Sequence, residues 1–155
     1  TKGELGKNAP RVDKDAAHAV LRGVYQAIQT GCVLSAHDLS EGGVMAAAAE
    51  MAIGGKLGID VDVSRLVVEG ELDATKRLFS ESQSRLLLEV GKDDLDALSA
   101  SLGDAPHAVV GEVTAAAVLR YRAGATTLAE LELGDAEAAW KRPLDVDGTL
   151  LEEVN

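Results

Sequence analysis

The sequence has little cysteine, little positive charge and no long hydrophobic run. Cys32 is the single cysteine of 155 residues, so the chain cannot form an internal disulfide. The formal net charge is -11, whereas proteins that bind a nucleic-acid backbone need clustered Lys and Arg to displace counterions. Nucleic acid is therefore not an expected partner, although a global sum leaves room for a local basic pocket that binds a small phosphate ligand.

The sequence also lacks the marks of membrane insertion and secretion. Its most apolar run, from Val44 to Ile53, is interrupted by Glu50 and is far shorter than the roughly 20 residues needed to span a bilayer. No apolar stretch combines the charged start and the small-residue cleavage site of a signal peptide. We therefore expect a cytoplasmic protein without a membrane partner. Because the chain opens with Thr1 instead of Met, we also expect a piece of a longer polypeptide.

What is present is enough apolar sequence for one core. With 46% hydrophobic residues, a chain of this length favours a single domain over residues 1–155. Helical spacing of apolar residues predicts helices over 13–30, 43–53, 71–79, 93–102 and 135–141. Alternating or short apolar runs predict strands over 33–36, 59–63, 86–90, 107–113, 117–122 and 126–131. Since these elements are mixed without strict alternation, the predicted fold is an α+β, or layered α/β, domain with a mixed sheet packed against helices.

The most informative segment is the polar turn from Ser35 to Gly43, which precedes the second predicted helix. Glycines directly before a helix leave backbone N–H groups accessible, and the helix dipole favours an anion there. Gly42 and Gly43 are therefore candidate phosphate-binding residues. The residues alone favour the alternative that a polar side chain of the turn caps the helix and satisfies these donors. The candidates for such a cap are Asp38, Ser40 and Glu41.

A second dense polar loop, from Phe79 to Arg85, separates a predicted helix from a buried strand. The guanidinium of Arg85 can bind a phosphate or carboxylate through its fork of donors. Glu81 and Gln83 can orient ligand groups or a metal-bound water. The pattern fits equally well an internal ion pair between Glu81 and Arg85.

The remaining acidic pairs do not predict a metal site. Asp60 and Asp62 alternate with apolar residues, so we interpret them as the solvent face of a strand. A second acidic group stands at a predicted helix start, where negative charge is favourable. Its members are Asp93, Asp94 and Asp96.

No catalytic nucleophile is predicted either. Cys32 has no base at the spacing of a known motif. His37 lies next to Asp38, but adjacent residues rarely hydrogen-bond in the geometry of a catalytic pair. We interpret His37 as a structural histidine.

Together, the motifs and their order resemble the phosphoribosylformylglycinamidine synthase family, specifically the AIR synthase-related carboxy-terminal domain of its second half. The resemblance is carried by residues 35–43, the Ala-rich helix that follows, and Leu78 to Arg85 before a hydrophobic strand. Thr1 to Gly6 is similar to the segment that enters this domain in the family, and Ala139-Trp140 is similar to its closing helix. The resemblance thus covers nearly the whole chain.

The resemblance implies an ATP-dependent ligase of purine biosynthesis. The complete enzyme would convert formylglycinamide ribonucleotide to its amidine with ATP, Mg²⁺ and ammonia derived from glutamine. Phosphoryl transfer would activate the amide oxygen, which ammonia then displaces. The implied partners are the amino-terminal domains of the same enzyme and a glutaminase domain or subunit. Because the main ATP site and the reactive residues lie there in the family, we expect this chain to be inactive alone.

The resemblance also implies which residues of this chain meet the ligand. Phosphate or nucleotide contacts are expected from Gly42, Gly43, Ser82 and Arg85, with Asp38 and Glu81 as supporting polar residues and no catalytic or metal-binding residue. One alternative is a non-catalytic half that docks neighbouring domains or the glutaminase, which a large exposed apolar patch would favour. Another is a domain of a different ATP-dependent member of the superfamily, such as selenophosphate synthetase or aminoimidazole ribonucleotide synthetase.

Overall fold

The structure is a computed structural model that describes residues 11–143. The predicted entry segment from Thr1 to Gly6 lies outside the described residues. The elements follow in the order α1 (Lys14–Thr30), β1 (Val33–Asp38), α2 (Gly43–Gly55), β2 (Gly58–Asp62), the 3₁₀ turn η1 (Val63–Arg65), α3 (Ala74–Phe79), β3 (Leu86–Val90), the 3₁₀ turn η2 (Lys92–Asp94), α4 (Leu95–Leu102), β4 (Gly111–Thr114), β5 (Val118–Ala123), β6 (Thr126–Glu132) and α5 (Leu133–Lys141). No helix within residues 11–143 is long and apolar enough to cross a membrane.

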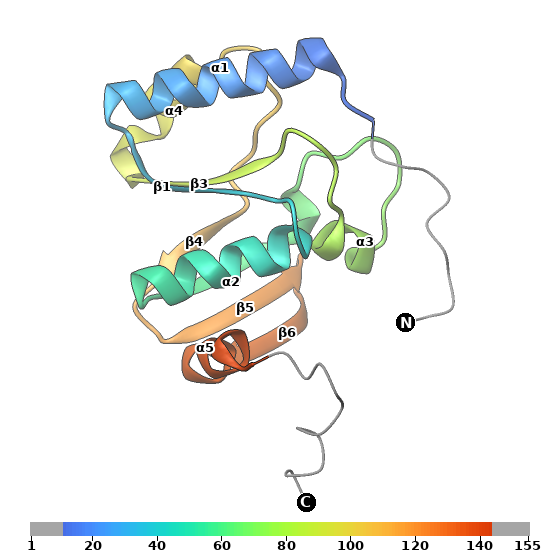
Figure 1. The fold of residues 1–155 in the computed structure, drawn as a ribbon, viewed down its shortest axis with the longest axis vertical. Helices are drawn as coiled ribbons and strands as arrows, with labels where there is room; N and C mark the ends of the chain where they lie inside the picture. The colour runs from blue at the N-terminus through green and yellow to red at the C-terminus, as the bar shows by residue number, and fades with distance from the viewer. Residues whose placement is uncertain (1–10, 144–155) are drawn as a thin grey trace, which may run out of the picture.

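The strands form two separate sheets. A four-stranded sheet has the order β4-β2-β5-β6, in which β2 and β5 run parallel and the other pairs are antiparallel. An antiparallel ribbon of β1 and β3 stands apart from it. Figure 1 shows α1 and α4 beyond the ribbon, and α2 between the ribbon and the larger sheet. The predicted α+β fold with a mixed sheet is confirmed, and the separate ribbon is what the sequence did not predict.

The main core lies where α2 covers one face of the four-stranded sheet. Tyr121 and Leu119 of β5 are almost completely buried there, and the Tyr121 hydroxyl donates a hydrogen bond to the Met45 carbonyl of α2 at 2.8 Å. Small buried side chains on α2, among them Ala47 and Ala48, let the helix approach the sheet closely. The Ala-rich helix predicted from the sequence is therefore the centre of the core.

A smaller core joins α1, α4 and β3. Val24 of α1 and Leu102 of α4 are buried in it, and Gly23 permits the close approach, because a Cβ atom there would lie 3.0 Å from the Cα of Leu102. The predicted ends of α1 are confirmed. The Asp13 carboxylate accepts hydrogen bonds from two N–H groups of the first turn, and Gly31 ends the helix in the left-handed conformation.

The interpretation of Asp60 and Asp62 as a solvent face was wrong. Both alternate along β2 with the core residues Ile59 and Val61, but Asp62 is only 6% exposed. The parallel register sets Asp60 beside Arg120 and Asp62 beside Arg122. Arg122 reaches both carboxylates, with its Nε 2.6 Å from Asp60 Oδ1 and its Nη1 2.7 Å from Asp62 Oδ2. Because β5 is the neighbouring strand, the two carboxylates form ion pairs with arginine instead of facing solvent.

Several element boundaries also differ from the prediction. The helix predicted from residue 71 begins at Ala74, because the Asp73 carboxylate caps it by accepting from the Lys76 N–H. The strand predicted from His107 begins at Gly111. His107 is instead held by the Ala105 carbonyl, 2.8 Å from its Nδ1.

Replacing Asp62 with asparagine is expected to lower the stability of the domain more than the same change at Asp60. Asp62 accepts from the Ser64 hydroxyl, the Ser64 N–H, the Gly124 N–H and Arg122. The Ser64 hydroxyl, ahead of the other donors, lowers the pKa of Asp62 to about 2. A lowered pKa means that this stabilisation is complete above the ordinary value of 3.8 and is lost as the pH falls towards 2.

Urea denaturation at several pH values measures this dependence. Between neutral pH and pH about 3, the D62N variant should lose less stability than the unchanged protein. Equal pH dependence of the two proteins would contradict the assigned role of Asp62.

Candidate functional site

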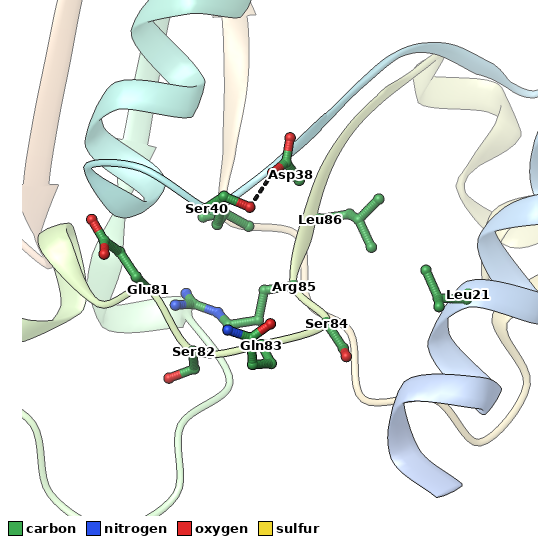
Figure 2. A pocket seen from close by; sticks show the side chains of 10 residues that line it. Leu21, Asp38, Ser40, Glu81, Ser82, Gln83, Ser84, Arg85 and Leu86 are labelled. Carbon is green, nitrogen blue, oxygen red and sulfur yellow. Dashed lines mark hydrogen bonds between the residues drawn. The ribbon is translucent and has the colours of Figure 1, made fainter. Parts of the chain in front are cut away.

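The two polar loops predicted separately converge on one pocket. The antiparallel pairing of β1 with β3 sets Asp38 opposite Leu86, and the Leu39 N–H donates to the Arg85 carbonyl at 3.1 Å. The end of the first motif therefore lies beside the end of the second. Between them is a pocket of about 280 Å³ (Figure 2). Its lining is Leu21, Asp38, Leu39, Ser40, Glu81, Ser82, Gln83, Ser84, Arg85 and Leu86.

Arg85 supplies the cation of this pocket. Its Nη1 donates to the Ser80 carbonyl at 3.0 Å, and burial lowers the pKa of its guanidinium. No carboxylate among residues 11–143 forms an ion pair with Arg85, so the proposed internal pair with Glu81 is not formed. In Figure 2 the guanidinium extends from the start of β3 towards the side of the pocket where Glu81 lies. The remaining donors of the guanidinium are available to a ligand.

Glu81 caps α2 from the opposite loop. Its Oε1 accepts from the Gly42 N–H at 2.8 Å, whereas no side chain of the turn itself caps the helix. The expected cap by Asp38, Ser40 or Glu41 is thus wrong. The Asp38 carboxylate instead accepts from the Ser40 hydroxyl, which is the main reason that the pKa of Asp38 is lowered. The helix start therefore has a negative charge beside it, as the helix dipole favours, and this charge is the carboxylate of Glu81.

The two glycines have different surroundings. Both adopt the left-handed conformation, with φ of 73° at Gly42 and 63° at Gly43. Gly43 is buried under the end of α3, where a Cβ atom would lie 2.6 Å from the Leu78 carbonyl oxygen and 2.9 Å from the Phe79 backbone. Close packing and backbone conformation are therefore sufficient reasons for a glycine at position 43.

The structure brings four of the six predicted site residues to the pocket wall, namely Asp38, Glu81, Ser82 and Arg85. The Gly42 N–H donates to the pocket residue Glu81. Gly43 packs against the backbone of Leu78 and Phe79. Leu21, on α1, lines the pocket as well, and nothing in its local sequence marks it. Ser84, a further lining residue, has a φ of 61°, which is uncommon for serine.

The size and charge of the pocket limit what it can hold. Its volume is at the low end for small-molecule sites, so it suits a phosphate group better than an entire nucleotide. Two carboxylates and one guanidinium line it, together with the hydroxyls of Ser40, Ser82 and Ser84. Binding of an anion therefore depends on Arg85 and on uncharged donors as well as on the net charge of the lining. Among residues 11–143 there is no group of three His, Cys, Asp or Glu residues that could hold a metal ion.

Comparison with known protein families assigns the chain to one of them. The family described as AIR synthase related protein, C-terminal domain, matches residues 1–123. The match covers most of the chain, and it includes both motifs that line the pocket. The chain belongs to this family.

Two of the curated relatives are subunits with the same name. The chain is 37% identical over 105 residues to the phosphoribosylformylglycinamidine synthase subunit PurL of Thermococcus sibiricus, covering 68% of this chain and 14% of that protein. It is 36% identical over 138 residues to the same subunit of Deinococcus radiodurans, covering 87% of this chain and 18% of that protein. The chain thus spans less than a fifth of the length of these relatives.

Solved structures share the fold. Thermotoga maritima PurL complexed with FGAR has a TM-score of 0.77 at 22% identity, over 86% of this chain and 23% of that chain. The same protein complexed with ATP has a TM-score of 0.70 at 23% identity, over 76% and 21%. The structure of PurLQS from Thermotoga maritima gives 0.73 at 23% identity, over 82% and 22%. At these identities the likeness establishes the fold alone.

Proposed function

We propose that this chain is the carboxy-terminal domain of a phosphoribosylformylglycinamidine synthase, an ATP-dependent ligase that converts formylglycinamide ribonucleotide to its amidine in purine biosynthesis. The observation that carries the proposal is the convergence of residues 35–43 and 78–85 on one pocket. These are the segments by which the sequence resembles that family. The names of the relatives from Thermococcus and Deinococcus support the same assignment.

Within that enzyme, the pocket would bind a phosphate of the ribonucleotide or of ATP. The Ser82 hydroxyl and the free donors of Arg85 supply side-chain contacts. Gly42 and Gly43 form the turn at the start of α2, where backbone N–H groups can donate to a phosphate. The Gly42 N–H becomes available when its hydrogen bond to Glu81 is broken. Asp38 accepts a hydrogen bond from the Ser40 hydroxyl, and Glu81 accepts one from the Gly42 N–H. Both carboxylates thereby position polar groups around the pocket.

The chain alone would not turn over substrate. Among residues 11–143 there is no cluster of metal-ligating residues, and the lining of the pocket contains no Cys, His or Lys. Such a pocket can bind a ligand without supplying its chemistry. The amino-terminal domains of the longer protein would supply the ATP and Mg²⁺ site, and a glutaminase domain or subunit would supply ammonia. The PurLQS assembly of Thermotoga maritima, which shares this fold, is consistent with such a multi-subunit enzyme. We place the enzyme in the cytoplasm, in line with the single cysteine.

The function is tested by the release of ADP from the longer protein that contains this chain. The assay supplies ATP, Mg²⁺ and ammonia, and offers formylglycinamide ribonucleotide or selenide as the second substrate. Turnover with formylglycinamide ribonucleotide alone is the expected result. Turnover with selenide would assign the chain to another member of the superfamily.

The pocket is tested by changing Arg85 to glutamine in the same protein. Loss of a charge-assisted hydrogen bond should raise the KM for ATP or for the ribonucleotide by roughly 10-fold to 100-fold. The matched control is Arg120 to glutamine, since Arg120 lies on the far side of the sheet and pairs with Glu130 at 2.7 Å. The control should leave both KM values unchanged.

A second candidate function, a docking half, is favoured by the surface of α1. Leu21, Tyr25 and Ile28 form a stripe at helical spacing, and they are 56%, 62% and 48% exposed. The neighbouring stripe, which includes Val20 and Val24, is covered by α4 and β3. Only half of the apolar face of α1 is therefore used within residues 11–143. The occupant we propose is a neighbouring domain of the longer protein, because the relatives are more than five times as long as the matched segment.

The Arg85 comparison separates the two candidates. A docking half without ligand contacts predicts that R85Q leaves both KM values unchanged. A half that binds ligand predicts that R85Q raises a KM, whether or not it also docks. The two roles are compatible, since Leu21 belongs both to the stripe and to the pocket wall.

A further inference from the structure

His37, interpreted from the sequence as structural, lies between two acceptors. Its Nδ1 is 2.7 Å from the carbonyl oxygen of Asp38, and its Nε2 is 2.8 Å from Oε2 of Glu50 on α2. A carbonyl oxygen and an ionised carboxylate accept hydrogen bonds and cannot donate them. Both ring nitrogens must therefore carry a proton for both contacts to form.

A neutral imidazole cannot satisfy this geometry in either tautomer. With the proton on Nδ1, the lone pair of Nε2 faces the Glu50 carboxylate. With the proton on Nε2, the lone pair of Nδ1 faces the Asp38 carbonyl. The arrangement as it stands is that of a charged imidazolium, and removing one proton breaks one of the two contacts.

Glu50 extends the contact to the last helix. Its other oxygen, Oε1, accepts from the indole Nε1 of Trp140 on α5 at 3.2 Å. Glu50 thus joins β1 to α5, two elements that are far apart in the sequence. We propose that His37, Glu50 and Trp140 form a proton-dependent clasp that connects the pocket end of β1 to α2 and α5.

The two carboxylates that contact His37 favour the closed clasp. Glu50 faces it from α2 and the Asp38 carboxylate from its own strand, with Oδ1 3.6 Å from Nδ1, while the residue opposite on β3 is Leu87. On α5, the charged residues Glu137 and Lys141 pair with each other, and Glu137 also pairs with Lys56. The hydrogen bond to the Asp38 carbonyl is the main cause that raises the pKa of His37, and Glu50 adds to it.

The direction of the pH effect follows from the raised pKa. The stabilisation by the clasp is fully present below the ordinary histidine value of 6.5 and is lost as the pH rises through the higher pKa of folded His37. The clasp therefore opens at a pH above the ordinary histidine value of 6.5.

The clasp makes His37 a positioning residue for the pocket. Its Nδ1 holds the peptide of Asp38, and Asp38 and Ser40 line the pocket directly after it. When the imidazole loses its proton, this peptide loses one of its anchors. The clasp is independent of the ligand that the pocket takes, so the inference stands apart from the proposed function.

The test uses two probes in the 155-residue chain. The chain contains one tryptophan and three histidines, so Trp140 fluorescence and the imidazole NMR signals can be assigned. Between pH about 5 and about 9, we expect the His37 signal to titrate above 6.5 and the Trp140 emission to change over the same pH interval.

The E50Q variant supplies the matched control, because it keeps an oxygen acceptor for Trp140 and removes the charge that faces His37. It should move the His37 midpoint to lower pH and leave the titration curves of the other two histidines unchanged. The H37N variant should abolish the pH dependence of the emission. The clasp is refuted if His37 titrates at the same pH in E50Q as in the unchanged chain, or if the emission does not follow His37. A folded state in each variant is verified by the dispersion of its NMR signals.

Discussion

Replacing Gly43 with alanine should lower the free energy of unfolding by about 3 kcal/mol. Two costs add: a left-handed conformation costs a residue with a Cβ roughly 1–2 kcal/mol, and overfilling a packed site costs typically 1–3 kcal/mol. Gly43 has a φ of 63°, and the added Cβ would meet backbone atoms of Leu78 and Phe79, which cannot move aside as a flexible side chain can. Urea denaturation measures the loss.

The matched control is Gly54 to alanine in the same helix. Gly54 is exposed, does not have the left-handed conformation and has no atom within 4 Å of the position of a Cβ. There the change should raise stability by up to about 1 kcal/mol, because alanine favours a helix over glycine. Similar effects at the two positions would show that packing against α3 does not determine the glycine at 43. Reduced ligand affinity in G43A without loss of stability would instead point to a direct ligand contact.

Replacing Tyr121 with alanine should cost about 4 kcal/mol, the largest effect of any change considered for this domain. Tyr121 is completely buried on the core face of β5, and its removal would leave a cavity between the sheet and α2. Burial raises the pKa of Tyr121 above its ordinary value, so the hydroxyl remains a donor to the Met45 carbonyl throughout the neutral range.

Tyr121 to phenylalanine separates the ring from the hydroxyl. It removes one hydrogen bond and leaves the Met45 carbonyl without that donor, so it should cost about 1 kcal/mol. Thermal and urea unfolding of both variants measure the two costs. If phenylalanine cost as much as alanine, the hydrogen bond to α2, and not the packing of the ring, would be the main contribution of Tyr121. Because Met45 lies in the first turn of α2, this contact also holds the helix start at which Gly42 and Gly43 stand.

Local sequence was sufficient where the governing interaction is local. α1 was predicted with its bounds because Asp13 caps it and Gly31 ends it, and both act within a few residues. The Ala-rich α2 and the strands β3 and β5 were recognisable for the same reason, since spacing and composition alone mark them. Four of the residues that line the pocket, namely Asp38, Glu81, Ser82 and Arg85, could be named from the sequence because each motif is a continuous segment.

Pairing between distant segments was not predictable in the same way. The cap of α2 comes from Glu81, which is 39 residues away from Gly42, and a side chain from another loop leaves no mark on the sequence of the turn. The ion-pair ladder of Asp60 and Asp62 depends on β5 being the parallel neighbour of β2. Leu21 lines the pocket only because α1 packs over the ribbon.

The sequence by itself determined the elements, the apolar faces and the two polar motifs of this protein. The tertiary structure decided that the motifs share one pocket, that Glu81 occupies the helix start, and that His37 meets two acceptors. The physical reason is the range of the interactions. Caps, turns and hydrophobic periodicity act over a few residues, whereas strand pairing and side-chain contacts join segments whose separation in the chain carries no information about their distance in space.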